Sequence, residues 1–111
     1  MKITSVIYKL YEYKFETPVH LSGVALSSRK GFYLWLQDDR GAFGLGEAAP
    51  LPGFSRESLQ DVESSLADLR EIVESRSLEL QVSPQRISGI PELRHFSLSL
   101  QYGFEQAVFD L

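Results

Sequence analysis

Apolar and polar residues alternate along much of the first 47 positions, and this pattern predicts three strands. Residues 2–16 are rich in β-branched and aromatic side chains, and from Tyr11 onward aromatic and charged residues alternate strictly. Before Tyr11 the alternation is blurred, which indicates either a bulge or a strand covered on both sides. Residues 31–37 and 42–47 follow the same period around an Asp-Asp-Arg-Gly turn, so they predict an antiparallel hairpin.

Apolar residues in the second half recur at steps of three and four and predict two helices. Residues 56–75 carry one apolar stripe, and Ser55 is placed to cap their amino end. Ser97 or Ser99 is placed to cap a last helix, whereas residues 76–90 show no clear period. We therefore expect an α+β fold in the order β-β-β-α-α. It would be a three-stranded antiparallel meander followed by helices packed on one face.

Two irregular segments separate these elements. Residues 17–30 contain Pro18 and Gly23, which disfavour a regular strand, together with several apolar residues. Residues 48–54, Ala-Ala-Pro-Leu-Pro-Gly-Phe, predict a rigid connection. Apolar side chains on a loop such as residues 17–30 either pack down or face a ligand or partner.

Composition narrows the class of protein. The 111 residues are 43% hydrophobic and 23% charged, values typical of one globular domain. The absence of cysteine excludes disulfides, thiolate catalysis and cysteine-ligated metals. A net charge of −4 argues against a nucleic-acid partner. No apolar run approaches the ~20 residues of a membrane span, and the first residues have no signal-peptide pattern, so we expect a cytoplasmic protein.

Candidate catalytic groups are sparse. His20 and His95 lie far apart without metal-ligand spacing, and His20 has the better functional claim because it lies on the first loop. Glu47 follows a strand, and we expect it to be partly buried. It could be a backbone acceptor, an arginine partner or a catalytic acid, and the structural roles are favoured because no second polar catalyst is adjacent. Asp38 and Asp39 are interpreted as solvated turn residues.

The glycines and aromatic residues do not indicate nucleotide or nucleic-acid binding. The glycines at residues 41–46 lack the G-x-G-x-x-G spacing, and they lie between two strands rather than before a helix. The aromatic residues of the first two strands are better explained by sheet packing than by base stacking, because the chain is acidic.

One longer motif is far more specific. Residues 41–57, Gly-Ala-Phe-Gly-Leu-Gly-Glu-Ala-Ala-Pro-Leu-Pro-Gly-Phe-Ser-Arg-Glu, resemble the sequence G-x-x-G-x-G-E-x-A-P-L-P-G-x-S-x-E of the enolase superfamily, muconate-lactonising subgroup. Within that subgroup the chain is most similar to the o-succinylbenzoate synthase family. Dipeptide epimerases, N-acylamino acid racemases and muconate cycloisomerases share much of the pattern. Residues 103–111 are similar to the helix that enters the barrel, where E-x-A-x-x-D-L recurs.

This resemblance implies a two-domain enzyme, in which an α+β cap precedes a (β/α) barrel. Residues 1–98 would form the N-terminal capping domain, and residues 99–111 a helix leading into a C-terminal barrel absent from the sequence. An apolar helical pattern that is still unfinished at residues 107–111 agrees with this expectation. The family's barrel holds Mg²⁺ through three carboxylates and carries two lysines as acid and base. We therefore expect no catalytic residue, no metal ligand and no activity in this chain alone.

The resemblance also implies a reaction and a binding role. The reaction is the Mg²⁺-dependent syn-dehydration of a cyclohexadiene carboxylate (SHCHC) to o-succinylbenzoate in menaquinone biosynthesis, and the cap closes the barrel mouth with two loops. Glu47 would be structural, at the junction of cap and barrel. The substrate-binding candidates in the matching loops are His20, Leu21, Ser22, Gly23, Leu51, Gly53 and Phe54.

The implied partners are the barrel and a small carboxylate substrate, without nucleic acid or membrane, and the oligomeric state is left open. Two alternative functions also stay open. One is the cap of an N-acylamino acid racemase, dipeptide epimerase or muconate cycloisomerase. The other is a stand-alone α+β binding module without catalysis, since 111 residues can form an independent domain.

Overall fold

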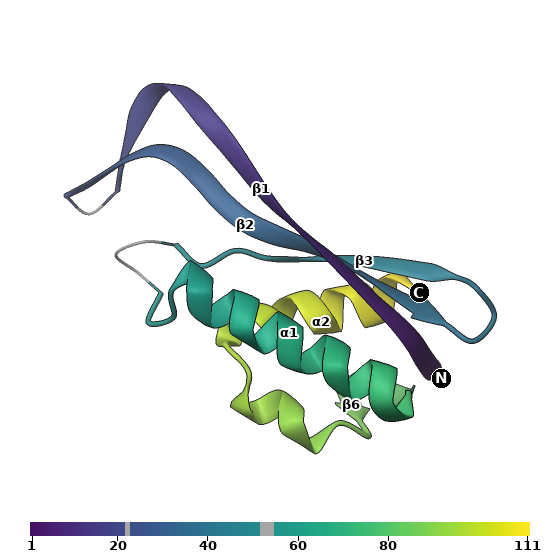
Figure 1. The fold of residues 1–111 in the computed structure, drawn as a ribbon. Helices are drawn as coiled ribbons and strands as arrows, with labels where there is room; N and C mark the ends of the chain where they lie inside the picture. Colours follow the sequence, from purple (N-terminus) through teal and green to yellow (C-terminus); the bar gives the residue numbers. More distant parts are fainter. Residues whose placement is uncertain (22, 52–54) are drawn as a thin grey trace.

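The computed structural model describes residues 1–21, 23–51 and 55–111, and over these residues the chain has the expected α+β architecture. A four-stranded sheet has the order β3-β2-β1-β4, and the helices cover one of its faces (Figure 1). A short strand, β4, adds to the predicted three-stranded meander. The elements are β1 (Lys2–Leu21), β2 (Val24–Asp38), β3 (Phe43–Ala48), α1 (Leu59–Arg76), β4 (Leu78–Glu79), β5 (Gln81–Ser83), β6 (Arg86–Ser88), the 3₁₀ helix η1 (Pro91–His95) and α2 (Leu98–Asp110).

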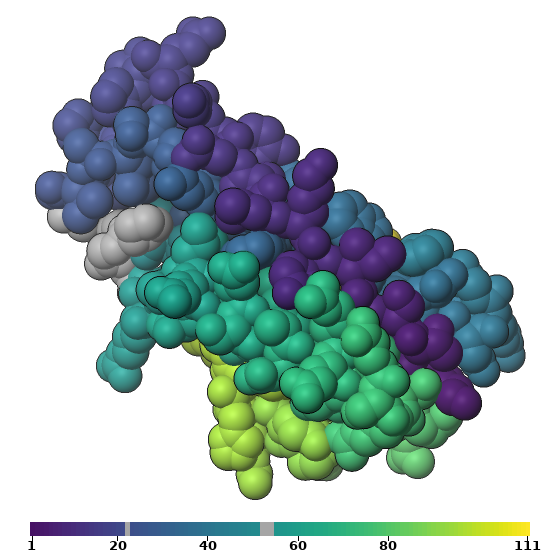
Figure 2. Space-filling model, viewed as in Figure 1, coloured from purple at the N-terminus to yellow at the C-terminus, as the bar shows by residue number. Residues whose placement is uncertain are grey.

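Strands β1 and β2 form a long antiparallel ribbon that extends past the helices (Figure 2). The prediction of an irregular loop over residues 17–30 was therefore wrong. Pairing shifts register between Lys14 and Val19, and it resumes where Val19 lies opposite Leu26. Pro18 falls inside this shift, so its missing N–H removes no hydrogen bond from the regular ladder.

A second register shift explains the blurred pattern at the start of β1. The pairing is irregular between Ile3 and Ser5, which confirms the bulge among the two predicted alternatives. Because of it, Ile3 and Val6 are both buried toward the helices although they are three residues apart. From Ser5 to Lys14 the pairing with β2 is then continuous.

Both helices begin at a serine cap, one of them later than predicted. Ser58, not Ser55, caps α1: its hydroxyl accepts the Asp61 N–H at 3.1 Å, and the Asp61 carboxylate accepts the Ser58 N–H at 2.8 Å. The predicted start at residue 56 was therefore wrong by one turn. For α2 the structure selects Ser97 from the two candidates, with its hydroxyl accepting the Leu100 N–H.

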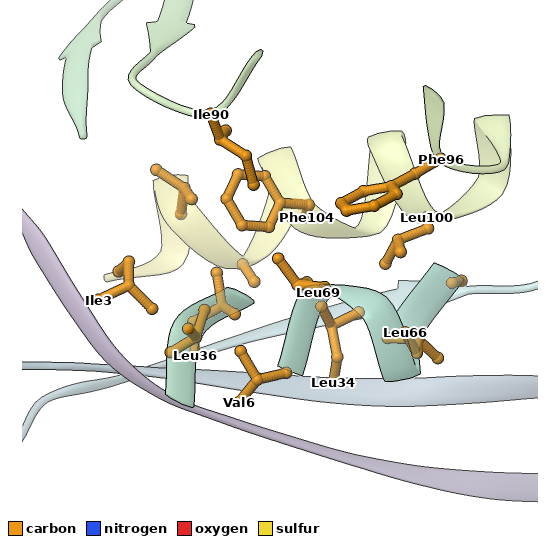
Figure 3. Close-up of a cluster of buried hydrophobic side chains, with 14 of the residues drawn as sticks. Ile3, Val6, Leu34, Leu36, Leu66, Leu69, Ile90, Phe96, Leu100 and Phe104 are labelled. Carbon is orange, nitrogen blue, oxygen red and sulfur yellow. The ribbon is translucent and has the colours of Figure 1, made fainter. Parts of the chain in front are cut away.

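The core lies between the sheet and the two helices. Side chains from the sheet and from both helices converge there, as Figure 3 shows for one cluster. Leu34, Leu36, Leu66, Leu69 and Phe104 are fully buried in it. Burying each such side chain stabilises a fold by roughly 1.5–3 kcal/mol. The predicted faces of β2 are confirmed, because its buried leucines point toward this core.

Helix α2 lies against the backbone of the edge strand β3. A Cβ atom added at Gly44 or Gly46 would collide with the carbonyl oxygen of Ala107 or Gly103, respectively. The helix also hydrogen-bonds to the free edge of β3. The Asp110 carboxylate accepts the Leu45 N–H at 2.8 Å, and the Gln106 side chain accepts the Glu47 N–H at 3.0 Å. The glycines of this motif therefore serve helix packing, and the edge strand is covered.

We expect Gly46→Ala to lower the free energy of unfolding by about 3 kcal/mol, because the methyl group meets a helix backbone that cannot yield. Urea denaturation of the wild type and variant measures this change. Leu45→Ala is the matched control on the same strand, since this side chain is 41% exposed, and it should cost less than about 1 kcal/mol. Equal effects of the two substitutions would contradict the close-packing argument.

Candidate functional site

The two predicted loop regions meet at one end of the domain. The turn between β1 and β2 lies at the same end as the connection from β3 to α1 (Figure 1). A groove of about 580 Å³ separates residues 25–30 from the segment 55–59 and Pro50. The structure thus brings two stretches that are distant in sequence into one candidate binding region.

None of the predicted substrate-binding residues that the structure describes lines this groove. His20 and Leu21 are exposed at the end of β1, as part of the strand and not of a loop. Gly23 lies in the turn with a φ of 80°, a conformation that favours glycine. Leu51 is half-buried in the connection. Ser22, Gly53 and Phe54 lie outside the described residues, so their contribution stays a prediction.

Arg29 ties β2 to the start of the connection. Its guanidinium donates to the carbonyl oxygen of Ala49 at 2.9 Å and to that of Pro50 at 3.3 Å. Two consecutive carbonyl groups suit the planar fork of an arginine better than the single ammonium of a lysine. Gly31 supports this contact, because its missing side chain leaves room for the Tyr11 hydroxyl and the Ala49 methyl group.

Two hydrogen bonds join Leu51 and Ser55 within the connection between β3 and α1. The Leu51 N–H donates to the Ser55 hydroxyl at 2.8 Å, and the Ser55 N–H donates to the Leu51 carbonyl at 2.9 Å. Ser55 was predicted as a helix cap, and the structure assigns it this different task. A serine side chain that bonds nearby backbone groups is typical of turns.

Glu57 ties the end of the connection to α2. Its half-buried carboxylate accepts both the backbone N–H of Ser99, at 2.7 Å, and the Ser99 hydroxyl. Burial acts to raise the pKa of Glu57, and the Asp61 charge adds to that. The hydrogen bonds from Ser99 and from the Glu57 backbone outweigh both, so the pKa of Glu57 lies below its ordinary value. Glu57 is thus held as an anion at the amino end of a helix, where negative charge is favoured.

Glu47 is exposed, so the expectation of partial burial was wrong. Burial and a hydrogen bond to Glu47 raise the pKa of the Tyr11 phenol, the Glu47 charge adds to the shift, and Arg29 opposes it. A hydrogen bond of 2.8 Å to Tyr13, together with burial, likewise raises the pKa of Tyr33. Both phenols therefore stay protonated near neutral pH, and Glu47 acts as an acceptor within the sheet.

The sheet face opposite the helices carries apolar and aromatic side chains beside the charged Lys9, Arg29 and Glu47. Tyr11 and Tyr33 stack at 4.5 Å between ring centroids, in agreement with the predicted role of the aromatic residues in sheet packing. Its apolar and aromatic part is larger than a face that meets only water needs, so that part has the character of a contact surface. Its exposed or half-buried apolar and aromatic members are Ile7, Tyr11, Tyr13, Tyr33, Trp35, Phe43 and Leu45.

The two histidines belong to different elements, His20 to β1 and His95 to η1, and both are exposed. Within residues 1–21, 23–51 and 55–111, no three histidine, aspartate or glutamate side chains converge to hold a metal ion. Over the same residues, no helix has the length and apolar character needed to cross a membrane.

Sequence reasoning missed Arg29 and Glu57 as site residues. Glu57 had a signal, because it is the last residue of the Ser-x-Glu that ends the quoted motif. Arg29 had none, since its partners are backbone carbonyl groups 20 and 21 residues away.

The lowered pKa of Glu57 predicts a pH-dependent contribution to stability. Because the folded value lies below the unfolded one, the contribution is complete above the unfolded pKa and is lost as pH falls through the folded pKa. Urea denaturation between about pH 7 and about pH 3 should show a shallower loss of stability for Glu57→Gln than for the wild type. Asp68→Gln, at an exposed helix position, is the control and should follow the wild-type profile. Coincident profiles for all three proteins would contradict the assignment.

Several known proteins are similar to this chain in sequence or in fold. Curated o-succinylbenzoate synthase from Thermosynechococcus vestitus is 31% identical over 100 residues, which are 90% of this chain and 27% of the relative. A solved o-succinylbenzoate synthase from Thermosynechococcus elongatus, with Mg in its active site, matches with a TM-score of 0.62 and 26% identity, over 96% of this chain and 30% of that one. The L-Ala-D/L-Glu epimerase from Bacillus subtilis matches in fold, with a TM-score of 0.75 and 18% identity, over 98% of this chain and 30% of that one.

The relatives are enzymes, and the chain spans about a quarter of the length of the curated synthase that it matches. The family described as "MenC, N-terminal domain" matches residues 4–108, almost the whole chain. With its α+β fold and its synthase relatives, the chain belongs to this family of enolase-superfamily N-terminal domains.

Proposed function

We propose that this chain is the capping domain of an o-succinylbenzoate synthase-like enzyme. The enzyme would carry out the Mg²⁺-dependent syn-dehydration of SHCHC to o-succinylbenzoate, in menaquinone biosynthesis and in the cytoplasm. The family match over residues 4–108 is the observation that carries this proposal. The two loop regions that share one end of the domain support it, because a cap needs them together.

In this proposal the cap closes the active site and shapes the pocket for the non-reacting part of the substrate. His20 and Leu21 are exposed at the end of the β1–β2 ribbon, where they are free to meet a substrate. Gly23 in the β1–β2 turn and Leu51 in the connection after β3 are further members, and Ser22, Gly53 and Phe54 complete the proposed set. None of these residues is proposed to transfer a proton, so the cap contributes binding, orientation and exclusion of water.

The proposed cofactor is Mg²⁺, which one solved synthase relative holds in its active site. The metal would stabilise the negative charge that develops when a proton is removed beside a carboxylate. The described residues of this chain form no cluster that fits a metal ion. In this proposal the metal ligands and the acid–base lysines belong to the barrel.

The proposed partner is a C-terminal barrel of the same polypeptide. The share of the relatives that this chain spans supports a larger protein. The apolar sheet face supports it as well, because side chains such as Trp35 and Leu45 are more stable against protein than against water. A stand-alone binding module would carry this apolar face without a layer to cover it.

A second candidate is the cap of an L-Ala-D/L-Glu epimerase-like enzyme. The higher TM-score of that neighbour favours it, whereas the sequence identity favours the synthase. Fold likeness alone does not distinguish the two, because members of one superfamily share a scaffold and differ in their sites.

We expect the longer protein that carries this chain to dehydrate SHCHC when supplied with Mg²⁺, and the 111-residue chain alone to be inactive. Product formation, measured by the absorbance of o-succinylbenzoate, tests both expectations. N-acylamino acids and dipeptides serve as the competing substrates. Racemisation or epimerisation without any dehydration would assign the chain to the alternative.

The same assay tests the loop assignment. Leu21→Ala should raise KM for the substrate by roughly fivefold, because one apolar contact is worth about 1 kcal/mol. Val82→Ala, on the β5–β6 ribbon, is the matched control, since Val82 is 39% exposed and Leu21 is 36% exposed. A similar KM for both variants would place Leu21 outside the substrate pocket.

A further inference from the structure

The connection between β3 and α1 is fixed on each side by an element that does not belong to it. At its start, Arg29 of β2 holds the carbonyl groups of Ala49 and Pro50. At its end, Ser99 of α2 holds the carboxylate of Glu57. The Arg29 contact belongs to no strand ladder, and the Glu57 contact joins the connection to the first turn of α2, so each ties the connection to a neighbouring element.

We propose that Arg29 and Glu57 are positioning residues for the proposed activity. They fix the two flanks of the connection and so set the geometry of the groove between β2 and residues 55–59. The inference rests on the proposed function, because it assigns the groove to the end of the cap that meets the substrate.

Arg29 acts from behind the groove. Arg29 does not line it, and in the register of β2 its side chain shares the sheet face of Tyr13 and Tyr33, opposite the helices. From there it holds Pro50, which is itself part of the groove wall. Loss of the guanidinium would leave two partly buried carbonyl groups without this donor and would release Pro50 from β2.

Glu57 acts from inside the groove. It lines both this groove and a neighbouring hollow of about 1060 Å³ that reaches Ser99 and Tyr102 of α2. Its carboxylate matches the amino end of α2 in charge and in hydrogen-bonding geometry. A glutamine keeps the size of this side chain but removes the charge, so it should weaken the tie without creating a cavity.

The connection starts at β3 and is tied to α2, and these two elements are packed firmly against each other. Helix α2 is locked onto β3 by the crowding at Gly44 and Gly46, and β3 leads directly into Ala49. A segment held on both sides cannot shift without breaking a charge-assisted hydrogen bond. The position of the groove wall is therefore coupled to the helix that, in this family, leads toward the barrel.

Hydrogen exchange on the chain measures this positioning directly. The amide protons of Leu51 and Ser55 are both hydrogen-bonded, so they report whether the connection is held. We expect Arg29→Met and Glu57→Gln to exchange these protons at least about tenfold faster. Arg76→Met is the matched control, because it removes another arginine contact, to Glu92, away from the groove. Unchanged exchange in both test variants would overturn the inference.

Steady-state kinetics on the longer enzyme separates positioning from a merely structural role. Arg29→Met and Glu57→Gln should raise KM for SHCHC by roughly fivefold to tenfold, with kcat changed less than about twofold. Arg29→Lys should lie between the wild type and Arg29→Met, and it covers the case in which the methionine variant does not fold. Lower thermal stability with an unchanged KM would overturn the inference.

The proposed function and the positioning role of Arg29 and Glu57 can fail independently. If the enzyme turns over another substrate of the subgroup and not SHCHC, the proposed function is wrong. The comparison of KM values on that substrate then decides whether Arg29 and Glu57 position the groove.

Discussion

The contact between α2 and the edge strand β3 is the constraint on which the rest of the domain depends. The two backbones approach so closely that side chains are excluded at Gly44 and Gly46, and polar side chains of the helix satisfy the N–H groups of Leu45 and Glu47. A hydrophobic contact alone would leave the helix free to slide along the strand. Here the backbone fit and the edge hydrogen bonds fix its position in two directions.

The candidate site is built on this frame by charged side chains and not by the core. Arg29 and Glu57 connect the irregular segment after β3 to β2 and α2, where regular secondary structure supplies no hydrogen bonds. Substrate-facing segments need such ties, because a loop that carries binding residues must be held in place by a rigid scaffold. The open sheet face complements this arrangement as a surface for a further layer of protein.

The sequence alone predicted the features that depend on near neighbours. Alternation placed Leu34 and Leu36 in the core and Tyr33 on the other face, and Ser97 was among the expected caps of α2. The predictions from the sequence were wrong where tertiary contacts outweigh a local signal. Pro18 suggested a loop, but the register shift in the ribbon accommodates it within β1. Ser55 is a residue type that caps helices, but its hydroxyl accepts the Leu51 N–H within a turn instead.

For this protein the sequence by itself determined the fold class and the faces of the strands, because both follow from the periodicity of apolar residues. It also determined the family, because a contiguous motif carries that resemblance. The tertiary structure alone decided why the motif has its glycines and what Arg29 and Glu57 hold. Those contacts join residues 20 to more than 60 positions apart, and no local pattern specifies which backbone group will lie within 3 Å of a given side chain once the layers have packed.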